Sequence, residues 1–422
     1  MWSFRGLTVR MIIIAALLSS CATEIMPTPS THQPEPTQER QEIVEIPSIT
    51  PTSTMVEPEY AAIEFNCLDI LPALPENAEL EGKLFLDVRV GYTSPPMLLD
   101  MKTREKNLLP ELELDGRHYR LSPNHRLLAY LSFRTGNEQL VVMNADGQEQ
   151  KISDWGEDWL RIAYWLDDNN LAIPFKRPES YSEPSTMLVM NIDSGEYDEL
   201  IEEYPNIVQM AREFDWAAPT FYDPTLNRVA YIASGEKALG FVSWDLQEEE
   251  FVGQLFPWLG TFGDPKWSPN GGLLLTINDV SSEQDITKSR SEFFTMTYDG
   301  EVERITQFTT LYDLPRIGNF EWSPDSRYIA FWILDDSTDS YETLAVMDLE
   351  KNQIMNYCIP GNQWMTVSGG PEWSPNSQQV VVNNISEESE EISRVILVDI
   401  NKEYAAVIAE NLAPIAWLAD SP

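Results

Sequence analysis

Short runs of alternating apolar and polar residues recur from about residue 82 to the C-terminus. Clear examples are residues 127–130, 229–232 and 328–332, which are rich in branched and aromatic side chains. Alternation with a period of two is typical of β-strands that are buried on one face. Similar runs rich in Leu and Val follow after polar loops of variable length; they are residues 140–144, 188–191, 344–348 and 396–399. The pattern therefore predicts an all-β fold of short strands.

A Trp-Ser-Pro-Asp/Asn motif divides this part of the chain into repeats. Its clear copies contain Trp267, Trp322 and Trp373. Weaker copies have their anchor residue at Leu121, Trp165, Tyr222 and Trp417. Neighbouring anchors are about 45 to 55 residues apart, a spacing typical of β-propellers, in which each repeat forms one blade of four strands.

The motif has a physical explanation at each position. The large apolar tryptophan is expected to pack between neighbouring sheets. Proline ends the strand because it has no amide N–H to donate. Aspartate or asparagine then occupies the turn.

The motif at residues 321–331, followed by Leu-Ala-Val-Met-Asp at residues 344–348, resembles the TolB-type, WD40-like propeller repeat. Similar repeats occur in propellers of dipeptidyl-peptidase and prolyl-oligopeptidase type. The resemblance covers roughly residues 82–420 and implies a propeller fold. TolB-type relatives act as protein-interaction platforms in the cell envelope, so the resemblance also implies a binding role. It specifies the fold more closely than the function, because propellers host many unrelated activities.

The two ends of the repeat region determine the expected number of blades. Residues 82–109 lack the Trp-Ser-Pro strand but contain runs that match second, third and fourth strands. Residues 415–418 supply the missing first strand. We therefore predict that residues 82–422 form a seven-bladed propeller of four-stranded antiparallel blades, closed by pairing of the C-terminal strand into the first blade. A six-bladed propeller with loose ends is the alternative. Closure removes the edge strands that promote aggregation.

The N-terminus has the features of a lipoprotein signal peptide, predicted at residues 1–20. Arg5 and Arg10 flank the start of a short apolar run that is too short to span a bilayer. Residues 18–21, Leu-Ser-Ser-Cys, resemble a bacterial lipobox, which implies cleavage before Cys21 and lipidation of its thiol. An ordinary secretory signal is the alternative. Because two or more acyl chains, such as palmitate, anchor a protein stably, we expect an extracytoplasmic protein attached to a bacterial membrane in the cell envelope.

Residues 21–62 are predicted to form a disordered tether, because they are rich in Pro, Thr and Glu and poor in groups that build a core. Residues 63–81 form a lead-in segment between this tether and the propeller. Cys67 in the lead-in and Cys358 in the repeat region remain once Cys21 is lipidated. In an oxidising compartment such a pair can form a disulfide, and two free thiols are the alternative.

The chain carries 68 acidic against 28 basic side chains, a net charge of −40. This composition disfavours nucleic acid as a partner, because phosphate backbones are bound by basic surfaces. Solubility explains the acidity most simply. The alternative is a cationic or metal-bridged ligand.

The sequence offers no catalytic motif. Its 3 histidines form no metal-binding cluster, and it contains neither a Gly-x-Ser-x-Gly elbow nor a phosphate-binding glycine loop. We therefore expect a monomeric, non-enzymatic scaffold for a protein or other ligand, without a cofactor. The alternatives are a carbohydrate-active hydrolase or lyase that uses carboxylates at the propeller rim, or a sensor domain of an envelope complex. The acidic loop at residues 335–342 is the best candidate for binding Ca²⁺, although a solvated loop explains it more simply.

Aromatic residues in the loops of one predicted rim form the candidate binding surface. Such rings stack on sugars or hold peptide side chains, and the alternative is that they pack between blades. The residues are Trp155, Trp159, Tyr181, Trp216, Trp258, Phe262, Tyr312 and Trp364.

Overall fold

The fold is described from a computed structural model. The chain divides into two compact units, Met1–Glu57 and Pro58–Pro422, and every described residue belongs to the second. The described residues are 60–88, 96–109, 119–132, 139–151, 163–175, 186–199, 220–222, 228–233, 238–243, 249–251, 266–279, 290–296, 302–338, 341–361, 370–386 and 389–421.

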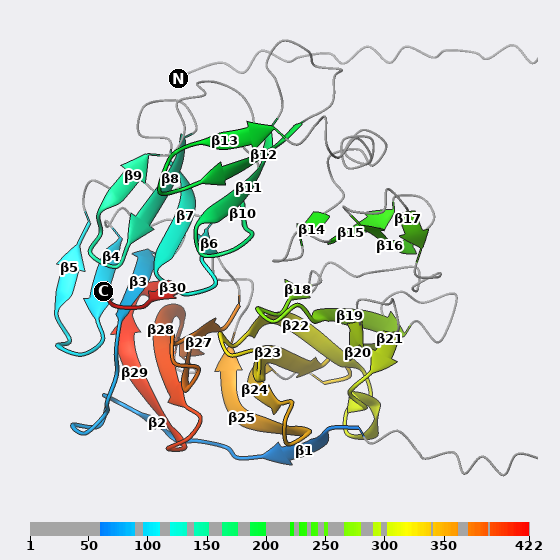
Figure 1. The fold of residues 1–422 in the computed structure, drawn as a ribbon. Helices are drawn as coiled ribbons and strands as arrows, with labels where there is room; N and C mark the ends of the chain where they lie inside the picture. Colours follow the sequence, from blue (N-terminus) through cyan, green and yellow to red (C-terminus); the bar gives the residue numbers. More distant parts are fainter. Residues whose placement is uncertain are drawn as a thin grey trace, which may run out of the picture. The chain divides into compact units, whose positions relative to one another are not determined.

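The described strands form seven separate sheets, and each sheet contains one copy of the repeat (Figure 1). Within each repeat, successive strands pair antiparallel, as the alternating pattern and its turns predict. The strands of the first three sheets along the chain are β3 (Lys83–Val88), β4 (Met97–Asp100) and β5 (Lys106–Leu108); β6 (Arg120–Leu121), β7 (Leu127–Ser132), β8 (Gln139–Asn144) and β9 (Glu149–Lys151); and β10 (Tyr164–Trp165), β11 (Asn170–Phe175), β12 (Thr186–Asn191) and β13 (Tyr197–Glu199).

The next two sheets contain β14 (Thr220–Tyr222), β15 (Arg228–Ala233), β16 (Ala238–Ser243) and β17 (Glu249–Phe251), then β18 (Lys266–Trp267), β19 (Leu273–Asp279), β20 (Arg290–Met296) and β21 (Val302–Arg304). The 3-10 turn η2 (Phe308–Thr310) follows β21. The last two repeats contain β22 (Pro315–Trp322), β23 (Tyr328–Asp335), β24 (Glu342–Asp348) and β25 (Gln353–Gly361), then β26 (Glu372–Trp373), β27 (Gln379–Ser386), β28 (Ser389–Asp399) and β29 (Tyr404–Glu410).

The C-terminal strand β30 (Leu412–Leu418) pairs antiparallel with β3, which lies near the start of the described fold (Figure 1). Leu84 lies opposite Trp417, and Lys83 lies opposite Leu418. This is the predicted pairing of residues 415–418 beside residues 83–88. All of β30 is buried, so the sheet that begins at β3 depends on the last strand of the chain.

The lead-in segment adds strands that the sequence pattern did not predict. β1 (Ala62–Phe65) pairs parallel with β25, and β2 (Ile70–Leu71) pairs parallel with β29 (Figure 1). Each becomes the fifth strand of its sheet. The fold begins slightly before residue 62, the predicted end of the tether, because Ala61 is already buried in the core.

Apolar side chains from neighbouring sheets pack together and form the core. Phe293 on β20 meets Phe320 and Phe331 of the next sheet nearly edge to face, at centroid distances of 5.4 and 4.9 Å. This is the favoured geometry of aromatic pairs, and each pair adds about 0.5–1.5 kcal/mol beyond the area that it buries.

The serine of the repeat motif has a role that the sequence analysis missed. Ser323 is buried; its Oγ donates to Asp325 Oδ1 at 2.6 Å and accepts the N–H of Tyr328 at 2.8 Å. It therefore closes the turn that connects β22 to β23. Ser374 and Asn376 make the corresponding bond in the next repeat.

The residue after the turn Asp or Asn has a left-handed backbone. Ser326 and Ser377 both have φ of 59°. Glycine favours this conformation, yet serine is present because its Oγ bonds to the preceding repeat. Ser326 accepts the N–H of Asn270 at 3.1 Å, and Ser377 accepts that of Asp325 at 3.2 Å.

Candidate functional site

Three tryptophans of the motif connect their repeat to the one before it. The indole Nε1 of Trp373 donates to the carbonyl of Glu321 at 3.1 Å, and that of Trp322 donates to the carbonyl of Lys266 at 3.1 Å. Trp165 bonds to the carbonyl of Arg120 in the same way, at 2.8 Å. Packing between sheets was predicted for the ring, and the hydrogen bond was not. Each of these three indoles fixes the backbone of the residue that precedes the anchor position of the previous repeat. The indole of Trp417 donates instead to the carbonyl of Glu81 at 2.8 Å.

The residue before the anchor is charged in four repeats, and in three of these an indole hydrogen bond fixes its backbone. These four residues occupy equivalent register positions on four first strands, each opposite the second strand of its own sheet. We name them the first-strand charge cluster: Arg120, Lys266, Glu321 and Glu372. All four are partly accessible to solvent.

Lys266 and Glu321 form an ion pair between neighbouring sheets. The Lys266 ammonium also lies 5.6 Å from the centroid of the Phe320 ring, a favourable cation–π distance. Gly370 lies against Glu321, because a Cβ added to this glycine would meet Glu321 Cγ at 3.5 Å. The carboxylate of Glu321 is therefore paired with Lys266, and its side chain lies close to Gly370.

Glu372 occupies a different environment. Burial is the main cause that raises the pKa of its carboxyl well above the ordinary value, and the nearby charge of Glu321 raises it further. Lys266 and Arg120 act in the opposite direction but do not compensate. Within the described part of the chain, no hydrogen bond or ion pair reaches the Glu372 carboxylate.

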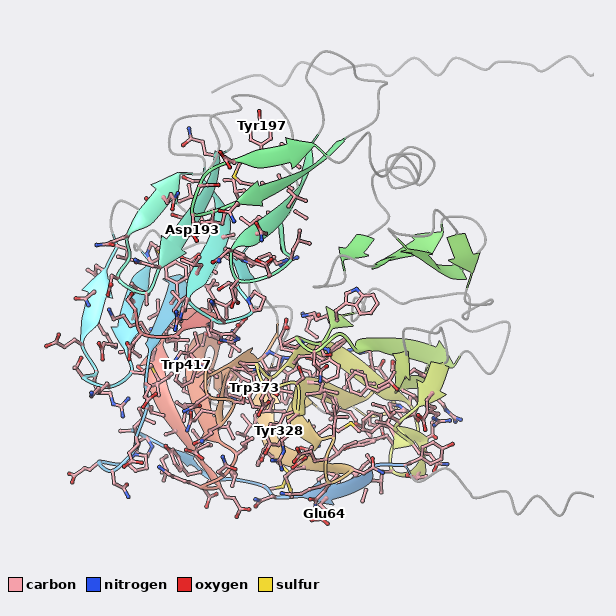
Figure 2. All side chains as sticks on the ribbon, in the orientation of Figure 1. Glu64, Asp193, Tyr197, Tyr328, Trp373 and Trp417 are labelled. Carbon is pink, nitrogen blue, oxygen red and sulfur yellow. A yellow bond between two sulfur atoms is a disulfide. The ribbon has the colours of Figure 1, made fainter. Side chains whose placement is uncertain are left out.

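Trp373, the residue that follows Glu372 on β26, stacks against another aromatic side chain. Its ring stacks on that of Tyr328, with centroids 5.8 Å apart and 24° between the ring planes. Both residues are labelled in Figure 2. Tyr328 is in turn covered by the Arg327 guanidinium at 4.8 Å. The aromatic stack between β23 and β26 therefore includes the residue that directly follows Glu372 in the sequence.

The predicted aromatic rim is mostly outside the described residues. This applies to Trp155, Trp159, Tyr181, Trp216, Trp258, Phe262 and Trp364. Tyr312 is described: it packs against a core cluster, and its Oη accepts a hydrogen bond from Asn356 Nδ2 at 3.2 Å. Burial raises the pKa of its hydroxyl. This ring therefore serves packing, the alternative that the sequence left open.

Cys67 and Cys358 are joined in a disulfide that links residues 291 apart in sequence. Cys67 follows β1 in the lead-in, and Cys358 lies on β25. The bond adds to hydrogen bonds that Asn66 and Leu68 donate to carbonyls of β25. The lead-in is thereby fixed to the outer strand of its sheet. Cys21 lies outside the described residues.

The acidic loop proposed for Ca²⁺ uses its first carboxylate locally. Asp335 accepts hydrogen bonds from the backbone of Asp313, Leu314 and Ser337. Burial acts to raise the pKa of Asp335, but these bonds outweigh it and lower the pKa overall. Asp336 pairs with Arg316 at 3.3 Å. Among the described residues, no group of three or more His, Cys, Asp or Glu is arranged to hold a metal ion.

The first-strand charge cluster is the site that sequence reasoning missed. The signal was present: the residue before the anchor is Arg, Lys, Glu and Glu in four copies of the motif. What the sequence did not reveal is that these positions approach one another.

Comparison with known proteins supports the fold. No protein-family model matches the sequence, and no curated protein does. Among solved structures, a puromycin hydrolase is similar with a TM-score of 0.50 and 12% identity, over 84% of this chain and 54% of that one. TolB from Acinetobacter baumannii is similar with a TM-score of 0.44 and 13% identity, over 79% and 82% of the two chains. An oligogalacturonate lyase from Vibrio parahaemolyticus has a TM-score of 0.48 and 10% identity, over 78% and 86%.

The chain has a TolB-like propeller fold. The repeat motif, one antiparallel sheet per repeat and the likeness to the puromycin hydrolase agree on this point. At such low identity a likeness shows the fold alone, and the similar structures carry the names of a hydrolase and a lyase as well as TolB. The function therefore has to be argued from the residues of this chain.

Proposed function

We propose that this protein is a non-enzymatic binding scaffold, held outside the cytoplasm by a lipid on Cys21. In this proposal the seven sheets are the blades of one propeller, and the pairing of β30 with β3 closes it. The proposal is supported by one sheet per repeat and by the contribution of the last strand to the first sheet.

The extracytoplasmic location is supported by the disulfide between Cys67 and Cys358, because such bonds form and persist in oxidising compartments. Within the residues that the structure describes, no helix has the length and apolar character needed to span a bilayer. In the proposal, attachment depends on acyl chains at Cys21.

The first-strand charge cluster is the observation that carries the binding role. Strands from four sheets contribute two basic and two acidic side chains at equivalent positions, and indole hydrogen bonds fix three of their backbones. Pre-organised charged groups suit recognition, because little ordering is needed when a ligand binds.

One observation favours an enzyme as the second candidate. A glutamate with a raised pKa beside a second carboxylate is the arrangement of a general acid and its partner in glycosidases and lyases. In that case Glu372 would protonate a leaving oxygen and Glu321 would remain ionised.

The scaffold and the enzyme are distinguished by whether the protein converts a substrate into products. Soluble full-length Cys21→Ser protein is incubated with uronide oligomers and with a peptide library, and products are followed by mass spectrometry. In parallel, the wild-type protein is cross-linked in cells. We expect a reproducible cross-linked partner and no products. Product formation that is lost in Glu372→Gln would overturn the scaffold and support the enzyme.

A further inference from the structure

An open hollow of about 430 Å³ lies where β11, β12 and the turn between β12 and β13 meet. Pockets that bind small molecules typically have volumes of about 300–1,000 Å³, so the hollow has room for a small organic ring. It uses no residue of the first-strand charge cluster. The described residues that line it are Asn170, Val189, Asn191, Gly195, Glu196 and Tyr197.

Two asparagine side chains in the hollow are held in fixed positions. Asn170 and Asn191 lie opposite each other in the register, and Asn191 Nδ2 donates to Asn170 Oδ1 at 3.1 Å. Asn170 Nδ2 donates to Asp167 Oδ2 at 2.7 Å, and Asn191 Oδ1 accepts the N–H of Ser194 at 3.0 Å. Each –NH₂ group carries a second N–H beyond these bonds, and both side chains are partly exposed. The hollow therefore presents pre-positioned amide groups to a ligand.

An aromatic ring lies at the edge of the hollow. Tyr197, the first residue of β13, is 53% exposed. Figure 2 shows its ring projecting away from the sheet. A tyrosine ring supplies a large, rigid contact surface that loses little entropy on binding.

In two other repeats the position equivalent to Tyr197 is covered by the lead-in segment. Ile354 on β25 and Ala405 on β29 occupy it, since each lies opposite the penultimate residue of the preceding strand, as Tyr197 does. Both are buried. β1 places Ile63 beside the first, and β2 places Ile70 beside the second. β13 is the outer strand of its own sheet, so this position carries an exposed ring instead.

The glycine of the turn shows a similar contrast. Gly147, in the turn between β8 and β9, has a left-handed backbone, and a Cβ placed on it would meet Leu109 Cδ2 at 3.2 Å. Gly195 has φ of 69°, and no atom of the described residues lies within 4 Å of a Cβ placed there. The space beside the turn from β12 to β13 is therefore open.

We propose that this hollow binds a neutral sugar, a pyranose whose C–H face stacks on Tyr197 and whose hydroxyls bond to the two asparagines and to Glu196. Amides donate to and accept from hydroxyls, and a carboxylate accepts from them. The electron-rich face of an aromatic ring attracts C–H groups, which carry a small positive charge. The proposal adds a ligand class to the scaffold role and does not depend on it.

The charges at the hollow favour a neutral ligand over an ion. None of the described residues that line it is basic, and Glu196 is acidic. An anionic sugar is therefore repelled, and the net charge of −40 adds to this effect. A divalent cation such as Ca²⁺ needs six to eight oxygen ligands, and no group of three or more His, Cys, Asp or Glu among the described residues is arranged to hold a metal.

The test uses the full-length Cys21→Ser protein and methyl β-D-glucopyranoside as the probe. Glucitol, an open-chain polyol, is the control without a ring face, and methyl β-D-glucuronide is the anionic analogue. Saturation-transfer NMR follows the binding of each compound. We expect saturable transfer to the axial ring protons of the glucoside, with a dissociation constant on the order of 1 mM. Binding of the glucuronide should be weaker, and glucitol should show no saturable transfer.

Exposed side chains allow matched variants. Tyr197→Ala should weaken glucoside binding about fivefold or more, whereas Tyr197→Phe should retain most of it because the ring face remains. Tyr341→Ala is the control, since Tyr341 is 59% exposed but does not line the hollow. Glu196→Gln should narrow the difference between the glucoside and the glucuronide. Thermal midpoints check that each variant is folded.

Three results would overturn the proposal. The first is no saturable transfer to the glucoside in the parent protein. The second is a glucuronide that binds as tightly as the glucoside. The third is equal glucoside binding by Tyr197→Ala and Tyr341→Ala. None of these results bears on the proposed scaffold role, which is decided separately by product formation and by cross-linking in cells.

Discussion

Replacement of Trp373 tests how the repeats are held together. Its side chain is 1% exposed, its indole donates to the Glu321 carbonyl, and its ring stacks on Tyr328. Truncation of a buried tryptophan to alanine typically costs about 3–5 kcal/mol. Leaving the Glu321 carbonyl without its donor contributes about 1–3 kcal/mol of this. We expect Trp373→Ala to lower the free energy of unfolding by about 4 kcal/mol.

Trp373→Phe separates the two contributions. It keeps most of the ring but removes the indole N–H, so we expect a loss of about 1–3 kcal/mol, the cost of leaving the carbonyl unpaired. Trp322 supplies a matched comparison, because it makes the same bond to Lys266 at 3.1 Å but is only partly buried. Trp322→Ala should therefore cost less than Trp373→Ala.

The assay is urea denaturation followed by far-ultraviolet circular dichroism, with the slope of free energy against urea compared between variants. An unchanged slope indicates that the midpoint shift reports stability. The reasoning is refuted if Trp373→Ala costs less than 1 kcal/mol, or if Trp322→Ala proves the more damaging change.

Three other contacts allow direct tests. Burial lowers the pKa of His125 to about 4, whereas the unfolded imidazole has a pKa of 6.5. The free energy of unfolding should therefore reach its full value above about pH 6.5 and fall by at most about 3 kcal/mol towards pH 4. Urea midpoints measured across this pH range check the prediction, and it is contradicted if His125→Asn shows the same dependence of the midpoint on pH as the parent protein. Cys67→Ser should lower the free energy of unfolding by about 2–4 kcal/mol, because it frees the lead-in. Its stability is compared with that of the oxidised and the reduced parent protein, and equal stability of the variant and both parent forms contradicts the prediction. A Cβ at Gly361 would lie 2.2 Å from the buried Trp332 ring, so Gly361→Ala should lower the free energy of unfolding by about 1–3 kcal/mol. The double variant with Trp332→Phe should recover part of this loss, because the smaller ring relieves the clash. No recovery in the double variant contradicts the clash.

Much of the fold was predictable because the information is local. The period-two pattern predicted strands, and each of the seven anchor positions lies on the first strand of its repeat. Even the pairing of residues 415–418 with residues 83–88 followed from the sequence, because one end of the chain lacked a strand that the other end supplied. Repeats make this possible, since each copy reports the structure of the others.

The lead-in strands were not predictable in the same way. β1 and β2 are short, and their residues alternate weakly between exposed and half-buried positions. They are strands because the outer edges of β25 and β29 offer unpaired backbone groups. Nothing in the local sequence encodes that edge.

The sequence by itself determined the strands, their turns and the repeated anchor, since these depend on neighbours within a few residues. Only the tertiary structure decided that Lys266, Glu321 and Glu372 share one electrostatic environment. The three residues come from different repeats, and their proximity arises from the packing of one sheet against the next. The pKa of Glu372 is raised because that packing removes water and brings a second carboxylate near it.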